Sequence, residues 1–152
     1  MMYPWHATFH LGIVHFMAYP HAKTEDDILK TVYKILNDDF FQAIEVNVLY
    51  EDKILEKISA QCETAHVEFL LGTQPLFLSN QINLNSMNDE ERYRAIDLSK
   101  IQIDRSYRYR ARALTMLSGR YDLIARKEEL KQKLILSLKE LCHYSQEKGN
   151  AA

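Results

Sequence analysis

The sequence predicts an α/β fold in which four consecutive strand–helix units form one parallel sheet. Short apolar runs alternate with segments whose apolar residues recur at helical spacing, which is typical of such units. The units are of nearly equal length and together fill the chain. A chain of 152 residues, 47% of them hydrophobic, can bury one ordinary core. We therefore expect a single domain that spans residues 1–152.

The first strand is expected at residues 9–16, where an apolar run ends near His15 and a loop follows at residues 17–22. Neither face of this run is wholly polar, so we expect both of its faces to be covered, as in parallel sheets flanked by helices. Ligands of such sheets gather beyond the carboxyl ends of the strands, which makes His15 a candidate binding residue. The alternative, a histidine packed in the core, is favoured by strand chemistry alone.

Three further strands and four helices follow in alternation. Thr24 and Asn88 are expected to cap helices with acidic first turns, and Gly149 is expected to end the last helix. The segment 72–86, rich in Asn, Gln and Ser, is expected to be an irregular functional loop. We expect the helices at about 24–37, 52–62, 88–107 and 126–148, and the remaining strands at 41–49, 65–71 and 111–117.

Charge and composition limit the classes of partner. The chain has 19 basic and 21 acidic residues, so bulk charge does not suggest nucleic acid or an anionic membrane. Arginines and tyrosines interleaved at 105–112 superficially look like an RNA-binding patch, but basic residues at a helix end also complement the helix dipole, which is the interpretation we prefer. No apolar run approaches the ~20 residues of a membrane span. We expect a cytoplasmic protein, with Cys62 and Cys142 as free, buried thiols.

Polar residues near the predicted strand ends are the candidates for binding. Glu45 is a carboxylate inside an apolar strand, so it is paired, near solvent or functional. Asn83 and Asn85 either orient a ligand or form turns by bonding to their own backbone. The run 118–120, Ser-Gly-Arg, precedes a helix and could hold an anion through backbone N–H groups and the guanidinium of Arg120. A solvated surface arginine is the alternative for Arg120.

Five segments of the chain occur in the order found in one family: GIVHFMAYP, AIEV, NLNSMNDEER, RALTMLSGR and SLKELCHYSQEKG. In this order and spacing the chain resembles the amino-terminal half of the sugar phosphate isomerase/epimerase family, the xylose isomerase-like (β/α)8 TIM barrels. The resemblance covers essentially the whole chain. One departure is Tyr109-Arg110, where relatives usually place a glycine between helix and strand, so this turn is expected to be strained or differently shaped.

The resemblance implies a half barrel, because a complete (β/α)8 barrel typically needs ~250 residues. Members of the family commonly bind a divalent metal, such as Mn²⁺, Mg²⁺ or Zn²⁺, through residues of the carboxyl half, so no metal ligand is carried over to this chain. A missing carboxyl half or a second copy of the chain would complete the barrel. The residues that would line one wall of a sugar or sugar phosphate pocket are His15, Glu45, Gln74, Asn83, Asn85, Ser118, Gly119 and Arg120.

Two functions of different class remain open from the sequence. The first is an isomerase or epimerase of carbohydrate metabolism, of which this chain is half and which alone would show no appreciable activity. The second is a non-catalytic scaffold or interaction module that forms a homodimer or larger species through its open sheet. An open flavodoxin-like sheet with helices on both faces fits the same alternation, but the family resemblance argues against it.

Overall fold

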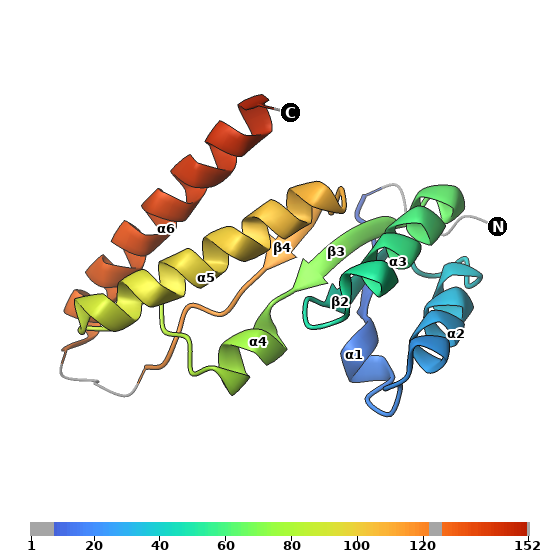
Figure 1. Cartoon of the computed structure of the whole chain (residues 1–152), viewed down its shortest axis with the longest axis horizontal. Coiled ribbons are helices and arrows are strands. Elements are labelled where there is room, and N and C mark those ends of the chain that lie inside the picture. The colour runs from blue at the N-terminus through green and yellow to red at the C-terminus, as the bar shows by residue number, and fades with distance from the viewer. Residues whose placement is uncertain (1–7, 122–125, 152) are drawn as a thin grey trace.

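Four parallel strands in sequential order form the sheet of the computed structural model, which describes residues 8–121 and 126–151 (Figure 1). The strands are β1 (Gly12–Val14), β2 (Ala43–Asn47), β3 (Glu68–Gly72) and β4 (Ala113–Thr115). Neighbours pair in the order β1-β2-β3-β4, with Ile13 beside Ile44 and Gly72 beside Thr115. The predicted α/β class with an all-parallel sheet is therefore confirmed.

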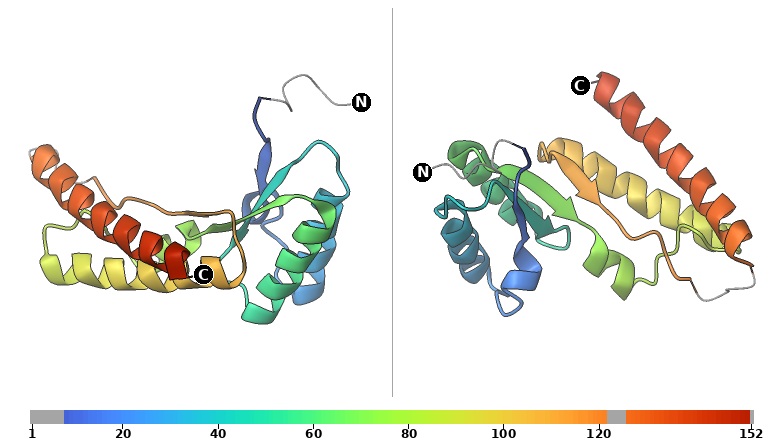
Figure 2. Two further views of the ribbon diagram at one scale, coloured as in Figure 1. Left: turned by 90° about the horizontal axis from the view of Figure 1, so that it is seen from above. Right: turned by 180° about the vertical axis from the view of Figure 1, so that it is seen from behind.

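The long helices form two pairs on either side of the molecule's middle. Helices α2 (Glu25–Leu36) and α3 (Asp52–Ala65) lie side by side, and so do α5 (Asp89–Arg108) and α6 (Lys127–Ala151) (Figure 2). Two short helices, α1 (His15–Ala18) and α4 (Gln74–Ser79), begin directly beyond the carboxyl ends of β1 and β3. They lie at the sheet edge where ligands of parallel sheets gather.

The helices cover one face of the sheet and leave the other open. The side chains of Ile44, Val46 and Leu71 point from the sheet into a core shared with α2 and α3. On the opposite face Glu45, Leu70 and Thr115 are only half-buried, and Gly12 and Ala113 are exposed. Sequential strand order with helices on one face is the arrangement of a barrel wall, whereas a doubly wound sheet reverses its strand order and carries helices on both faces. The flavodoxin-like alternative is therefore excluded.

Helix starts follow the capping residues that the sequence contains. Thr24 Oγ1 accepts a hydrogen bond from the backbone N–H of Asp27 at 3.2 Å, and Asn88 Oδ1 accepts one from Glu90 N–H at 2.9 Å. Each side chain satisfies a backbone donor that the first helical turn leaves unpaired. After α5, Arg110 adopts a left-handed conformation with φ 54°, a region that favours glycine. The unusual turn predicted at Tyr109-Arg110 is present.

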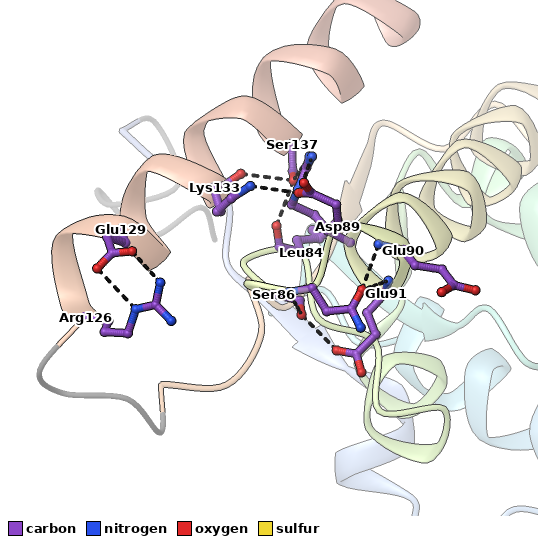
Figure 3. Close-up of polar contacts among 11 residues, drawn as sticks. Leu84, Ser86, Asp89, Glu90, Glu91, Arg126, Glu129, Lys133 and Ser137 are labelled. Carbon is purple, nitrogen blue, oxygen red and sulfur yellow. Dashed lines mark hydrogen bonds and ion pairs between the residues drawn. The ribbon is translucent and has the colours of Figure 1, made fainter.

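Helix α6 is held against the amino-terminal end of α5 by polar contacts (Figure 3). Ser137 Oγ donates to the carbonyl of Leu84 at 2.7 Å, and Lys133 Nζ lies 2.8 Å from Asp89 Oδ1. Deeper in the same interface Leu141 packs in a core with Ile96 and residues of α4. These contacts fix the position of α6 relative to the loop that follows β3.

The first strand differs from its prediction. It spans Gly12–Val14, and His15 already begins α1, where its carbonyl accepts the N–H of Tyr19 at 2.8 Å. The expectation that both faces of the strand are covered was wrong, because the described helices pack on one face only and Gly12 is exposed. Apolar residues therefore line a face that is partly open rather than a buried one.

Three other expectations were wrong. The segment 72–86 is not irregular throughout, because α4 forms in it, with Pro75 near its start. Gly149 does not end α6, which continues to Ala151; a Cβ at Gly149 would lie 3.1 Å from Tyr107 Oη, so this turn packs against α5. Cys62 is buried and free as expected, but Cys142 is exposed on α6.

The arginines at the end of α5 bind acidic residues and carbonyl groups near α3. Arg105 donates to the carbonyl of Val48 at 2.6 Å and pairs with Asp52 at 2.8 Å. Arg108 also pairs with Asp52, and Arg110 with Glu63. Their contacts join α5 to the β2–α3 unit. Among the described helices none is long and apolar enough to cross a membrane.

Candidate functional site

Three polar side chains meet on the open face of the sheet, at the carboxyl ends of the strands. Gln74, the first residue of α4, donates from Nε2 to Glu45 Oε1 at 3.0 Å and to Thr115 Oγ1 at 2.9 Å. Glu45 lies on β2 and Thr115 on β4, the two neighbours of the strand that Gln74 follows. The amide therefore bridges three successive strand ends. We call Glu45, Gln74 and Thr115 the edge cluster.

Gly72 gives the edge cluster its close packing. This residue is buried at the end of β3, and a Cβ added to it would overlap Glu45 Oε1. The same Cβ would lie 2.7 Å from Gln74 Oε1 and 3.0 Å from Phe16 Cε1. Such distances are too short for real contacts, so only glycine allows these side chains to approach the strand.

One acceptor of the edge cluster has no donor. Gln74 Oε1 is buried and accepts no hydrogen bond within the part of the chain that the structure describes. A buried carbonyl oxygen without a partner costs free energy, which a hydroxyl that reaches it would recover. Since the other end of the amide is held by Glu45 and Thr115, the orientation of this acceptor is already fixed.

A second polar group forms where the loop after α4 meets the loop after β4. Asn85 Nδ2 donates to the carbonyl of Arg120 at 3.0 Å, while Asn83 Oδ1 accepts the N–H of Asn85 at 3.3 Å. Gly119 has φ 120°, and a Cβ there would overlap Asn83 Oδ1 and lie 2.5 Å from Asn85 Oδ1. The buried Asn85 Oδ1 has no donor among the described residues. The structure thus brings together Asn83, Asn85, Gly119 and Arg120, and Asn83 forms the turn that the alternative interpretation expected.

A polar pocket of about 550 Å³ lies beside this second group, between the end of α4 and helix α5. Asn83 and Arg120 line it, together with Arg94, which the sequence analysis did not select. Glu91 also lines it, and its carboxylate accepts a hydrogen bond from Ser86 Oγ at 2.8 Å. Ser118 is exposed and does not line this pocket.

His15 lies among the helices rather than in either polar group. Its ring is fully buried; Nε2 is 2.8 Å from Thr31 Oγ1 and Nδ1 is 3.1 Å from Tyr50 Oη. The Thr31 hydroxyl donates to the carbonyl of Asp27 at 2.7 Å, so Nε2 carries the proton that Thr31 accepts, and Tyr50 donates to Nδ1. Burial lowers the pKa of His15 from 6.5 to about 4. Both ring nitrogens are thereby occupied within the fold.

The described residues do not fit the divalent metal that the family resemblance implies. Within residues 8–121 and 126–151 no three His, Cys, Asp or Glu side chains lie together as a metal site. Glu45 is the carboxylate of the edge cluster, and its partners there are a neutral amide and a hydroxyl. Hard divalent cations prefer several oxygen ligands including carboxylates.

Comparison with known proteins supports the fold. No family model matches the chain, and no curated protein matches its sequence. Among solved structures, it is similar to D-psicose 3-epimerase from Clostridium cellulolyticum H10 with D-tagatose, with a TM-score of 0.63 and 16% identity. The match covers 91% of this chain and 49% of that enzyme, which is a TIM barrel. The chain has the fold of half a (β/α)8 barrel. At this identity the similarity shows the fold and not the activity.

Thr115 and Arg94 were missed by sequence reasoning, for different reasons. Thr115 carries a usable signal, since it alternates with Leu114 on β4 and lies opposite Gly72 in the parallel register. A strand assignment with register would have placed it on the open face. Arg94 lies in the middle of α5, and only the position of α4 brings it to the polar pocket. No sequence pattern indicates that placement.

Proposed function

We propose that the open face at the carboxyl ends of the strands binds a sugar or sugar phosphate, as one wall of an isomerase- or epimerase-type barrel site. The observation that carries the proposal is the edge cluster, in which Gln74 is held by Glu45 and Thr115 while its buried carbonyl oxygen lacks a donor. Sugar hydroxyls both donate and accept hydrogen bonds, and a carboxylate, an amide and a hydroxyl supply both functions.

The fold supports the same class of ligand. The structurally similar epimerase is described with D-tagatose, a ketohexose, and ligands of parallel barrels bind at the carboxyl ends of the strands. The edge cluster lies at that end of β3 and β4, with Glu45 two residues before the end of β2. We therefore expect a ketohexose to bind there, with its hydroxyls donating to Gln74 Oε1 and to the carboxylate of Glu45.

The polar pocket beside α4 is the proposed position of a phosphate group. Arg94 and Arg120 bring two positive charges to its wall, and the side-chain amide of Asn83 adds a donor. The carboxylate of Glu91, which accepts a hydrogen bond from Ser86, also lines the pocket and leaves it with a net positive charge. Guanidinium groups are suited to phosphate because they donate two parallel hydrogen bonds. A sugar phosphate should therefore bind this chain more tightly than the free sugar, and lose that advantage when either arginine is replaced.

Binding, and not turnover, is expected from this chain by itself. In the proposed role Glu45 accepts a hydrogen bond from a sugar hydroxyl and Gln74 fixes the carboxylate in place. Isomerisation or epimerisation also needs groups on the opposite side of the sugar, which the resemblance assigns to the other half of a barrel. Conversion of a ketose by the pure chain with added Mn²⁺ or Mg²⁺, lost in Glu45→Ala, would overturn this expectation.

Calorimetric titration with D-tagatose, D-psicose and a ketohexose phosphate tests the proposal. We expect Gln74→Ala to weaken binding at least ~10-fold, since it removes a buried hydrogen-bonding group. Gln132→Ala is the matched control, because Gln132 is exposed on α6 far along the chain from the edge cluster. Equal affinities of the two variants, or no saturable binding of any of the three ligands, would contradict the proposal.

The second candidate function is a scaffold that associates through its open sheet. It is favoured by β1 and β4, each of which has a strand neighbour on one side only in the described structure. The two candidates are compatible, because association would use the edge strands β1 and β4, whereas sugar binding would use the open face of the sheet. Measuring the molecular mass in solution tests association, and ligand titration tests sugar binding.

A further inference from the structure

The two edges of the sheet are both open in the part of the chain that the structure describes. The strand order β1-β2-β3-β4 leaves β1 and β4 each with one paired side. Unpaired edges expose backbone donors and acceptors that can pair with another strand. The face opposite α2 and α3 is partly exposed as well, with Gly12 and Ala113 open to solvent at its two margins.

We infer that a second copy of this chain closes the sheet into a symmetric eight-stranded barrel. The matched enzyme is a barrel of which this chain covers 49%, so four further βα units are needed for closure. A two-fold axis along the barrel would bring β4 of each copy beside β1 of the other. The two strands of each pair would run parallel, and the symmetry would repeat this pairing at both seams of the barrel. A second copy would supply four further parallel strands in the same order.

The β4 edge carries an apolar groove that suits this arrangement. A cavity of about 320 Å³ lies between β4, α5 and α6, lined by Leu114, Met116, Leu138 and Cys142 among others. Leu138 is 40% exposed in the single chain. In a complete barrel the helix after one strand also covers the next strand, so α6 should cover the strand added beside β4.

The β1 edge offers the matching apolar residues. Ile13 lies on the helix-covered face of β1 and is only half-buried, and Leu11 precedes the strand with the same alternation and partial burial. When β1 of one copy pairs with β4 of the other, Leu11 and Ile13 would face the groove that Leu138 lines. Apolar surface at one edge therefore meets apolar surface at the other, and each contact occurs twice in the dimer.

Closure would also complete the proposed binding wall, although the inference does not depend on it. The two-fold axis places a second edge cluster across the barrel from the first. A sugar between them would meet Glu45 and Gln74 of both copies. A dimer that binds no sugar would leave the interface intact and refute the proposed function alone.

Sedimentation equilibrium of the full chain over about 1–100 µM tests the interface. We expect a dimer for the wild type and a monomer for Leu138→Arg, because the charge enters the apolar groove twice and should raise the dissociation constant at least ~100-fold. Leu136→Arg is the matched control, since Leu136 is 55% exposed on the same helix and does not line the groove. It should leave the dimer unchanged.

The thiol of Cys142 gives an independent measurement on the unmodified chain. It lines the groove and is exposed in the single chain, so its reaction rate with a thiol reagent should fall as the concentration rises into the dimer range. This measurement decides the matter if Leu138→Arg fails to fold by circular dichroism. A wild-type monomer across the range, or a dimer in which Cys142 reacts at the monomer's rate, would overturn the inference.

Discussion

The protonation of His15 leads to a quantitative prediction for stability against pH. The folded chain holds the ring neutral, because burial lowers its pKa to about 4, whereas the unfolded chain titrates near 6.5. Below pH 6.5 the unfolded state therefore binds a proton that the folded state does not. The free energy of unfolding should decrease as the pH falls through this window.

The magnitude follows from the two pKa values. Each pH unit between 6.5 and about 4 removes ~1.4 kcal/mol, so the loss attributable to His15 should approach about 3 kcal/mol near pH 4. This loss of stability should be complete below the pKa of the folded state and absent above pH 6.5. The contacts explain the preference: Nδ1 accepts from Tyr50, so a second ring proton would face a donor.

Urea unfolding at about pH 7.5 and 4.5 measures the effect in the wild type and in His15→Gln. Taking the difference between the two proteins cancels the titration of carboxylates that both share. We expect the free energy of unfolding of the wild type, minus that of His15→Gln, to fall by about 2–3 kcal/mol between the two pH values. His21→Gln is the control, since His21 is exposed and should follow the wild type. Parallel pH curves for wild type and His15→Gln would refute a buried neutral histidine.

Two substitutions test the helix cap and the close packing at the edge cluster. Asn88→Ala removes the acceptor of two backbone N–H groups at the start of α5 and should cost about 1 kcal/mol in urea unfolding; an unchanged midpoint would show that the cap is dispensable. Gly72→Ala should fold, because the overlapping atoms end flexible side chains, but should displace Glu45 and weaken sugar binding. Gly12→Ala, whose Cβ would lie 3.3 Å from the nearest atom, should bind normally, and equal affinities of the two alanine variants would contradict this reasoning.

The fold was predictable because each long element carries its own signal. Helices α2 and α5 begin at capping residues with acidic first turns, and the apolar spacing sets their buried faces. The short elements carried no such signal. Helix α4 has six residues, too few for a periodic pattern, and His15 joins α1 because the chain turns before Pro20 rather than continuing the strand. Helix α6 continues past Gly149, where a Cβ would lie 3.1 Å from Tyr107 Oη of another helix, and that contact cannot be predicted from the local sequence.

The candidate site was predictable only in part. Strand ends could be read from the sequence, and Glu45 and Gln74 do lie together at that edge. The sequence could not show that His15 lies apart from the edge cluster, because its position depends on how α2 and Tyr50 pack around the ring. The grouping of Asn85 with Gly119 likewise joins two loops that are distant in sequence. The binding roles of these residues stay predictions.

Chemical-shift mapping of the ¹⁵N-labelled chain during titration with D-tagatose tests the proposed binding face most directly. We expect saturable shifts for the backbone amides of Gly72 and Thr115 and for the side-chain amide of Gln74, whose carbonyl gains a donor. The amide of Val32, in the core between α2 and the covered face of the sheet, should not move. Shifts confined to the helices, or no saturable shift up to about 50 mM sugar, would contradict a sugar-binding wall at the carboxyl ends of the strands.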